Sequence, residues 1–225
     1  MEIKYLGHSA FLVKGKNIKA LIDPFINGNA SNNLKSTDFK DITHIFVTHG
    51  HGDHIGDTIE IAKRCNSKII CNFEMGYYFD KFELNVHTMH IGGRVKFDFG
   101  KVKMTPALHG SGIFYNGEMI DGGNPCGFVI EVQNKKIYHA GDTGLTMDMK
   151  LLKDEKIDIA LLPIGGNYTM DIDDAVLACG FIEPKKVIPM HYNTFDIIKA
   201  DPNEFKRKVE KSEVIVAKVN ENITV

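Results

Sequence analysis

The segment Thr48-His49-Gly50-His51-Gly52-Asp53-His54 constrains this chain more than any other part of its sequence. It places three imidazoles and one carboxylate within six positions, directly after the strand-like run 42–48. Buried polar groups need partners, so a loop of this composition beside an apolar strand indicates a metal site rather than a histidine-rich surface turn. The fold therefore has to bring further ligands to this loop.

The spacing inside this segment separates two sets of ligands. Alternate residues of an extended loop point the same way, so His49 and His51 can bind one cation together. Asp53 and His54 follow, where the chain should turn into a helix over 55–65, and they can face a second cation. The two glycines let the backbone fold tightly around both ions.

Three later strand-like runs also end in residues that can bind a metal. His109 follows the run 102–107, Asp142 follows 136–139, and His191 follows 186–190. Open α/β sheets usually gather their sites just past the ends of strands. A single histidine after a strand is more often structural, but four strand ends with compatible ligands indicate one shared site.

The predicted coordination uses seven residues, three at each of two ions and one that bridges them. The first ion takes His49, His51 and His109, the second takes Asp53, His54 and His191, and Asp142 lies between. Each ion keeps an open position, which is typical of a catalytic site. A hydroxide bridging the ions would be the nucleophile, because metal coordination brings the pKa of water to about 7. The predicted catalytic residues are Asp53, Asp142 and His191.

The order of secondary structure predicts an α/β (α+β) fold, a four-layer αββα sandwich. β-type runs dominate the first third of the chain, and strands alternate with helices in the last third. We expect a tight turn at 134–135, a helix from Thr169 or Asp171 to a capping Gly180, and a closing strand at 214–219. No repeat or low-complexity linker interrupts the chain, so we expect a single hydrolase domain over 1–225.

Charge and hydropathy exclude several classes of protein. The net charge is −2, so no global basic field recruits nucleic acid. No apolar run approaches the roughly 20 residues that a membrane span needs. The N-terminus lacks a signal-peptide layout, which predicts a cytoplasmic protein. The four cysteines have no C-x-x-C spacing, so we expect free thiols.

The pattern H-x-H-x-D-H with a later His, Asp and His resembles the metallo-β-lactamase superfamily over essentially the whole chain. Neighbouring motifs, among them Gly7-His8-Ser9 and Leu21-Ile22-Asp23-Pro24, are similar to those of small metal-dependent hydrolases related to the L-ascorbate-6-phosphate lactonase branch. This resemblance implies an αββα sandwich with the metals at one edge, between the sheets.

Five further residues are candidates for roles around the ions: His8, Asp23, Asn167, Tyr192 and Asn193. The resemblance implies that Asp23 accepts a hydrogen bond from a metal-bound imidazole, with a turn cap before Pro24 as the alternative. His8 either faces the substrate or is a structural histidine. The loop containing Asn167 can offer backbone N–H groups to an anionic substrate, and Tyr192 and Asn193 can stabilise an oxyanion.

The main functional prediction is an enzyme that hydrolyses a small ester, lactone or phosphoester, anionic substrates included. One alternative is a phosphodiesterase or nuclease acting on nucleotides or RNA, against which the near-neutral charge argues. Another is a non-catalytic metal-binding scaffold, against which the complete ligand set argues. Nitrogen and oxygen ligands suit zinc, manganese, iron or nickel, and the histidine count favours zinc. Relatives often form oligomers, so a homo-oligomer is one possible assembly of this chain.

Overall fold

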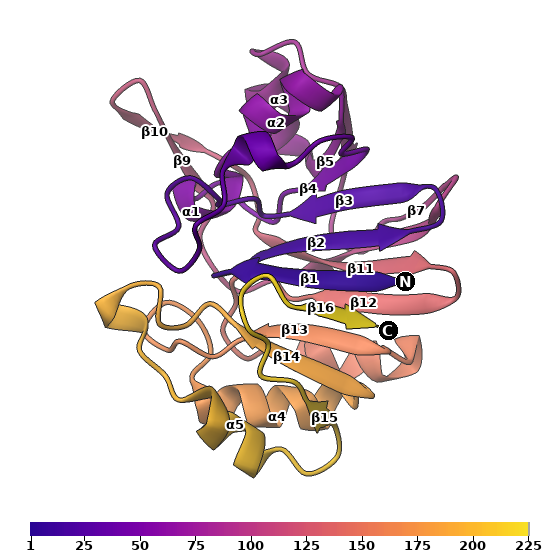
Figure 1. The fold of residues 1–225 in the computed structure, drawn as a ribbon, viewed down its shortest axis with the longest axis vertical. Coiled ribbons are helices and arrows are strands. Elements are labelled where there is room, and N and C mark those ends of the chain that lie inside the picture. The colour runs from indigo at the N-terminus through magenta and orange to yellow at the C-terminus, as the bar shows by residue number, and fades with distance from the viewer. Residues whose placement is uncertain (225) are drawn as a thin grey trace.

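The computed structural model describes residues 1–224, and most of its strands lie in two seven-stranded sheets (Figure 1). In spatial order, the first sheet contains β16 (Asn222–Thr224), β1 (Glu2–Gly7), β2 (Ala10–Gly15), β3 (Ile18–Ile22), β4 (His44–Phe46), β5 (Lys68–Asn72) and β6 (Val86–Met89). The second contains β15 (Glu213–Val214), β14 (Lys186–Met190), β13 (Ile159–Pro163), β12 (Lys135–His139), β11 (Cys126–Val132), β8 (Gly100–Pro106) and β7 (Arg94–Phe97).

The helices and one separate hairpin lie outside the two sheets. The helices are α1 (Gly52–Ile55), α2 (Thr58–Cys65), α3 (Phe73–Asp80), α4 (Ile172–Ile182) and α5 (Pro202–Lys208), with the 3₁₀ helices η1 (Ser36–Asp38), η2 (Met147–Glu155) and η3 (Asp196–Ile198). The hairpin of β9 (Gly112–Tyr115) and β10 (Glu118–Asp121) projects away from both sheets (Figure 1).

Apolar side chains pack in three layers, which confirms the predicted αββα sandwich. The middle layer joins the two sheets, and Phe46 of the first meets Phe128 of the second with ring centroids 5.3 Å apart. A second layer packs the outer face of the first sheet against α2 and α3, with Ile61 and Phe79 fully buried. The third packs the second sheet against η2, α4 and α5. Burial of this apolar surface is the main driving force for the fold.

The two sheets repeat one pattern of strand directions. In the first sheet the pairs β16–β1, β1–β2 and β2–β3 are antiparallel, and β3–β4, β4–β5 and β5–β6 are parallel. In the second sheet β7–β8, β8–β11 and β11–β12 are antiparallel, and β12–β13, β13–β14 and β14–β15 are parallel. Each strand therefore has a counterpart: β1 matches β8, β3 matches β12, β4 matches β13, and β5 matches β14.

Three predicted elements differ in the structure. The expected helix over 55–65 is divided into α1 and α2 at Gly56, whose φ is 45°. Helix α4 continues through Gly180 to Ile182 and ends at Glu183 in a left-handed conformation. The expected strand over 214–219 ends at Val214, after which the chain crosses to the first sheet to form β16.

Smaller predictions have mixed outcomes. The tight turn lies one residue earlier than expected, at Gln133-Asn134, where both φ values are positive, as a two-residue hairpin of type I′ requires. The four cysteines are free, as expected. Over residues 1–224, no helix has both the length and the apolar character to cross a bilayer.

Candidate metal centre

His49 and His51 lie in the connection from β4 to α1, Asp53 and His54 lie in α1 itself, and the connection is fixed by the segment after β8. The Gly50 N–H donates to Ser111 Oγ at 3.0 Å, and a Cβ on Gly50 would lie 2.5 Å from the Ser111 carbonyl oxygen. Gly50 is therefore required for this close approach. A Cβ on Gly52 would meet nothing within 4 Å, so packing does not require the second glycine, contrary to expectation.

The first cluster at this edge contains His49, His51 and His109. One nitrogen of each ring lies within 4.8 Å of the other two. His51 Nδ1 lies 3.0 Å from His49 Nε2 and 3.3 Å from His109 Nε2. Three imidazole nitrogens that converge in this way suit a cation, because each neutral ring offers one lone pair.

The second cluster contains Asp53, His54 and His191, together with His8. Their ligand atoms also lie within 4.8 Å of one another. His8, His54 and His191 are buried, whereas the Asp53 side chain is 30% exposed. The cluster therefore has a closed interior and one carboxylate at its open side.

Asp142 lies between the two clusters. Its Oδ2 is 2.8 Å from His191 Nε2 and 3.3 Å from His54 Nε2, both of the second cluster. The same oxygen is 3.6 Å from His109 Nε2 of the first cluster. Its Oδ1 is buried and has no hydrogen-bond partner. One carboxylate thus faces nitrogens that belong to both groups.

Asp23 fixes the tautomers of two of these histidines. Its Oδ2 accepts a hydrogen bond from His54 Nδ1 at 2.7 Å and another from the Thr48 hydroxyl at 2.7 Å. Because that hydroxyl donates to Asp23, it can only accept from His49 Nδ1, which lies 3.0 Å away. Both rings therefore direct an Nε2 lone pair into the site. Thr48 was not among the predicted site residues, and its only signal in the sequence is its place directly before His49.

Three non-glycine residues at the site have left-handed backbones. The φ angles are 56° at His8, 44° at Asp23 and 54° at His191. Such conformations cost about 1–3 kcal/mol each and persist where the surrounding structure enforces them. At this site they belong to two histidines of the second cluster and to Asp23, which bonds a third.

The buried carboxylates make this site electronegative. Burial alone would raise the pKa of Asp142, but His54 and His191 hold that pKa well below its usual range. Burial would also raise the pKa of Asp53, yet the contact with His8 and the charge of His54 lower it. Burial lowers the pKa of His49 well below its usual value and that of His8 to about 4. Ionised, buried carboxylates attract a cation.

The donor atoms present fit divalent metal ions. The buried Nε2 of His54 and Oδ1 of Asp142 lack hydrogen-bond partners, and buried polar atoms rarely stay unpaired. The negative charge of Asp142 is balanced by His54. Burial would lower the pKa of His54, but the charges of Asp142 and Asp23 raise this pKa well above its usual value. A metal ion would supply that positive charge and satisfy both atoms.

The remaining candidates lie around this core. Asn167 is exposed at the turn after β13, and Tyr192 packs against the outer core of the second sheet. Both polar groups of the Asn193 side chain bond the Ala200 backbone, at 3.0 and 3.1 Å. His139 donates to the Ser9 carbonyl at 2.9 Å and accepts from the Gly141 N–H at 3.1 Å, so it supports the backbone that leads to Asp142.

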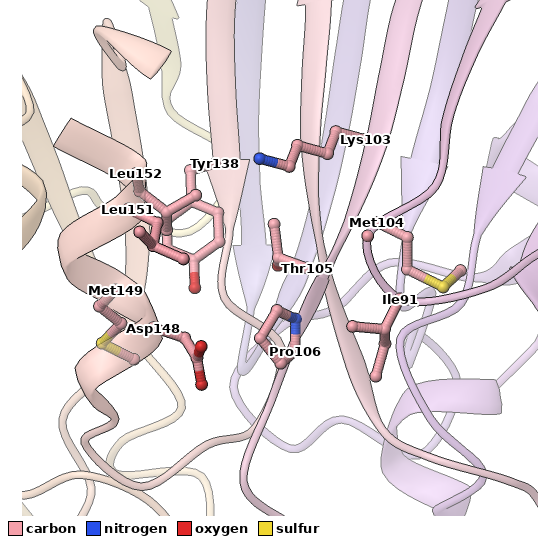
Figure 2. Close-up of a pocket in the computed structure, with 11 residues that line it drawn as sticks. Ile91, Lys103, Met104, Thr105, Pro106, Tyr138, Asp148, Met149, Leu151 and Leu152 are labelled. Carbon is pink, nitrogen blue, oxygen red and sulfur yellow. The ribbon is translucent and has the colours of Figure 1, made fainter. Parts of the chain in front are cut away.

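A cavity of about 250 Å³ lies elsewhere, on the outer face of the second sheet (Figure 2). Pro106 and Thr105 of β8, Tyr138 of β12 and Leu152 of η2 are among its lining residues. Its walls are mainly apolar, in contrast to the histidine clusters. The cavity is therefore separate from the metal centre.

Comparison with known proteins identifies the family of this chain and agrees with its fold. The Beta-lactamase superfamily domain matches residues 19–192. A UPF0173 metal-dependent hydrolase of Alkaliphilus metalliredigens (strain QYMF) is 58% identical over 221 residues, which cover 98% of each chain. One from Bacillus cereus (strain B4264) is 44% identical over 100% of each chain. The solved structure of Igni18, a novel metallo hydrolase from the archaeon Ignicoccus hospitalis, aligns with a TM-score of 0.91 and 38% identity, over 99% of this chain and 97% of that chain.

Proposed function

The chain belongs to the β-lactamase superfamily and to its UPF0173 metal-dependent hydrolases, and from this premise we propose a two-metal hydrolase of small, uncharged esters and lactones. The observation that carries the two-metal proposal is the place of Asp142. Its Oδ2 lies 2.8 Å from a nitrogen of one cluster and 3.6 Å from a nitrogen of the other. A carboxylate shared by two groups of ligands is suited to bridging two ions.

The proposed division of the ligands follows the spacing of the loop. His49, His51 and His109 would hold the first ion. The second would be held by Asp53, His54 and His191, with Asp142 shared by both. When bound, the ions would polarise a substrate carbonyl and lower the pKa of a coordinated water to about 7. This ligand set of imidazoles and carboxylates favours zinc, and manganese, iron and nickel also suit it.

The protein's own residues orient these ligands and move the proton. Asp23 and Thr48 hold His49 and His54 in the tautomer that directs Nε2 inward. The three carboxylates differ in side-chain exposure. The Asp53 side chain is 30% exposed, whereas that of Asp23 is 0% exposed and that of Asp142 is 3% exposed. Asp53 is therefore placed to take a proton from the attacking water and return it to the leaving group.

The composition of the ligand-bearing segments favours an uncharged substrate. The segments 48–54, 107–111, 140–145 and 191–197 contain no lysine or arginine. The next cation along the chain, Lys199, pairs with Asp196 at 2.7 Å. Enzymes that act on phosphate esters usually hold the phosphate with arginine or lysine. This argues for esters and lactones over phosphoesters, nucleotides or RNA.

A substrate panel tests this proposal. Zinc-loaded and manganese-loaded protein would be assayed with p-nitrophenyl acetate, p-nitrophenyl butyrate, a γ-lactone, p-nitrophenyl phosphate and bis-p-nitrophenyl phosphate. We expect turnover of the esters or the lactone that a chelator abolishes, at least about tenfold above the phosphates, a ratio that corresponds to about 1.4 kcal/mol. Preference for bis-p-nitrophenyl phosphate would overturn the substrate class. Elemental analysis that finds one metal per chain after saturation would overturn the two-metal proposal.

A further inference from the structure

His8 occupies the same place in the first sheet as the ligand His109 does in the second. His8 lies in the connection from β1 to β2, and His109 lies in the connection from β8 to β11. These two pairs of strands match in the topology of the sheets. His109 belongs to the first cluster and His8 to the second. Each half of the molecule therefore contributes one histidine from equivalent connections.

Both ring nitrogens of His8 are engaged. Nε2 lies 3.1 Å from Asp53 Oδ2, and Nδ1 lies 3.0 Å from the Thr194 hydroxyl. An ionised carboxylate only accepts hydrogen bonds, so Nε2 carries the ring proton and donates it to Asp53. Nδ1 then accepts from the Thr194 hydroxyl. Thr194 thus fixes the tautomer of His8, as Asp23 fixes that of His54.

The backbone of His8 is tied to the second cluster as well. Its carbonyl oxygen accepts from the His191 N–H at 2.9 Å and from the Tyr5 hydroxyl at 3.2 Å. The His8 and His191 rings lie 4.2 Å apart between centroids. Because His8 is fully buried, its ring has little room to rotate. The residue therefore forms a rigid link between Asp53 and His191.

We propose that His8, oriented by Thr194, is a positioning residue that holds the Asp53 carboxylate in place for the second metal ion. Asp53 lies at the open side of the cluster, and without this hydrogen bond its side chain could turn toward solvent. Partners of this kind typically contribute about 10–100-fold to metal affinity. This inference rests on the two-metal proposal, and its test separates the two.

Zinc titration of the metal-free protein, with a competing chelator, measures each site without turnover. His8→Asn is the informative variant, because asparagine tolerates the left-handed backbone and is too short to reach Asp53. We expect second-ion affinity to fall by about 10–100-fold, with first-ion affinity changed by less than about twofold. His8→Gln places an amide N–H near the position of Nε2 and should recover most of the loss.

Thr194 provides a matched pair of variants. Thr194→Val removes the hydroxyl at nearly constant shape and should weaken the second ion by about three- to tenfold, whereas Thr194→Ser should bind as wild type does. Wild-type binding of both ions by His8→Asn would overturn the inference, and so would an equal loss in His8→Asn and His8→Gln. A wild-type protein that binds one zinc would instead overturn the two-metal proposal itself. Circular dichroism and melting of each metal-free variant identify any loss that comes from misfolding.

Discussion

The two halves of the molecule share one strand topology but use it differently. Asp23 follows β3 in the first half, and Asp142 follows the matching strand β12 in the second. Both carboxylates are buried. Asp142 faces nitrogens of both histidine clusters, whereas Asp23 bonds the far side of His54 and the Thr48 hydroxyl. Equivalent strand ends thus supply the proposed shared ligand in one half and the support for a proposed ligand in the other.

The same contrast appears at other matched strand ends. The segment after β4, together with α1, carries four of the proposed ligands, while its counterpart after β13 contains the exposed Asn167. His191 follows β14, whereas Asn72 at the end of the matching β5 caps α3 by accepting from the Met75 N–H at 2.8 Å. Strand topology therefore determines where in the folded protein a residue lies, and the residue type determines whether it is suited to bind metal or to stabilise the fold.

The aspartate pair gives the largest expected difference. Asp142→Asn removes the shared ligand, so we expect kcat/KM to fall by about 10³-fold or more, since two-metal stabilisation is worth several kcal/mol. Asp23→Asn disturbs only the support of His54, so a fall of about 10–100-fold is expected. Ester turnover and zinc content measure both variants. Equal losses in the two variants would contradict the distinction between ligand and support.

The pair Asn72 and His191 separates stability from metal binding. Asn72→Ala removes a helix cap and two hydrogen bonds to the backbone oxygens of Gly122 and Asn124, so we expect a loss of about 1–3 kcal/mol. The melting temperature of the metal-free protein should then fall by about 2–10 °C with zinc content unchanged. His191→Asn should instead lose the second ion. Zinc loss in Asn72→Ala with an unchanged melting temperature would refute this assignment.

The matched loops after β4 and β13 give a smaller contrast. Asn167→Gly keeps the left-handed φ of 50° and removes the exposed side chain. Both ions should stay bound, and kcat/KM should fall by at most about tenfold, which corresponds to one hydrogen bond to the substrate. His51→Ala, in the loop after β4, should lose the first ion. Metal loss in Asn167→Gly would show that the second loop also supports the centre.

The smallest expected effect concerns acid stability on the outer face of the second half. Burial would raise the pKa of Glu155, but hydrogen bonds from Arg94, Lys103 and Lys136 lower it to about 2. Because the pKa of Glu155 is lower in the folded state, its ionised carboxylate stabilises the protein at pH values above 4.5, the pKa in the unfolded state. This contribution disappears as the pH falls toward 2.

Urea unfolding of Glu155→Gln at several pH values checks this prediction. We expect the variant to be about 1 kcal/mol less stable than wild type at pH 7, with the difference shrinking between pH 4.5 and 2. Glu60→Gln is the control in the first half, because Glu60 forms an exposed ion pair with Arg64 and should change stability by less than about 1 kcal/mol. A difference that grows on acidification would contradict the proposed cause.

The sequence predicted the fold class because most strands follow apolar patterns, but it missed elements that depend on distant contacts. The exposed hairpin of β9 and β10 pairs Phe114 with Met119, exposed by 71% and 67%, against the usual burial of apolar residues. Glycine is required at position 56, where α1 ends, because a side chain there would collide with the Pro24 carbonyl, a contact between segments far apart in the sequence. The crossing after Val214 likewise depends on pairing with β1.

The candidate ligands could be predicted from strand ends and the role of Asp23 from the family resemblance, whereas the contributions of Thr48 and Thr194 could not. The structure brings the seven predicted ligands together at one edge, since each follows a strand with a recognisable apolar pattern. Thr194 lies in a loop with no periodic pattern, and its contact with His8 spans 186 positions. The match between the two sheets was also hidden, because it is a likeness of topology with no sequence repeat.

The left-handed backbones of His8, Asp23 and His191 have a consequence for the evolution of this fold. Each carries a cost of about 1–3 kcal/mol, which glycine would avoid and asparagine would reduce. In a descendant freed from selection for hydrolysis such replacements would relieve this backbone cost, set against the buried hydrogen bonds that His8 and Asp23 make. Glycine or asparagine at all three positions would therefore mark a relative that has kept the sandwich and abandoned the reaction.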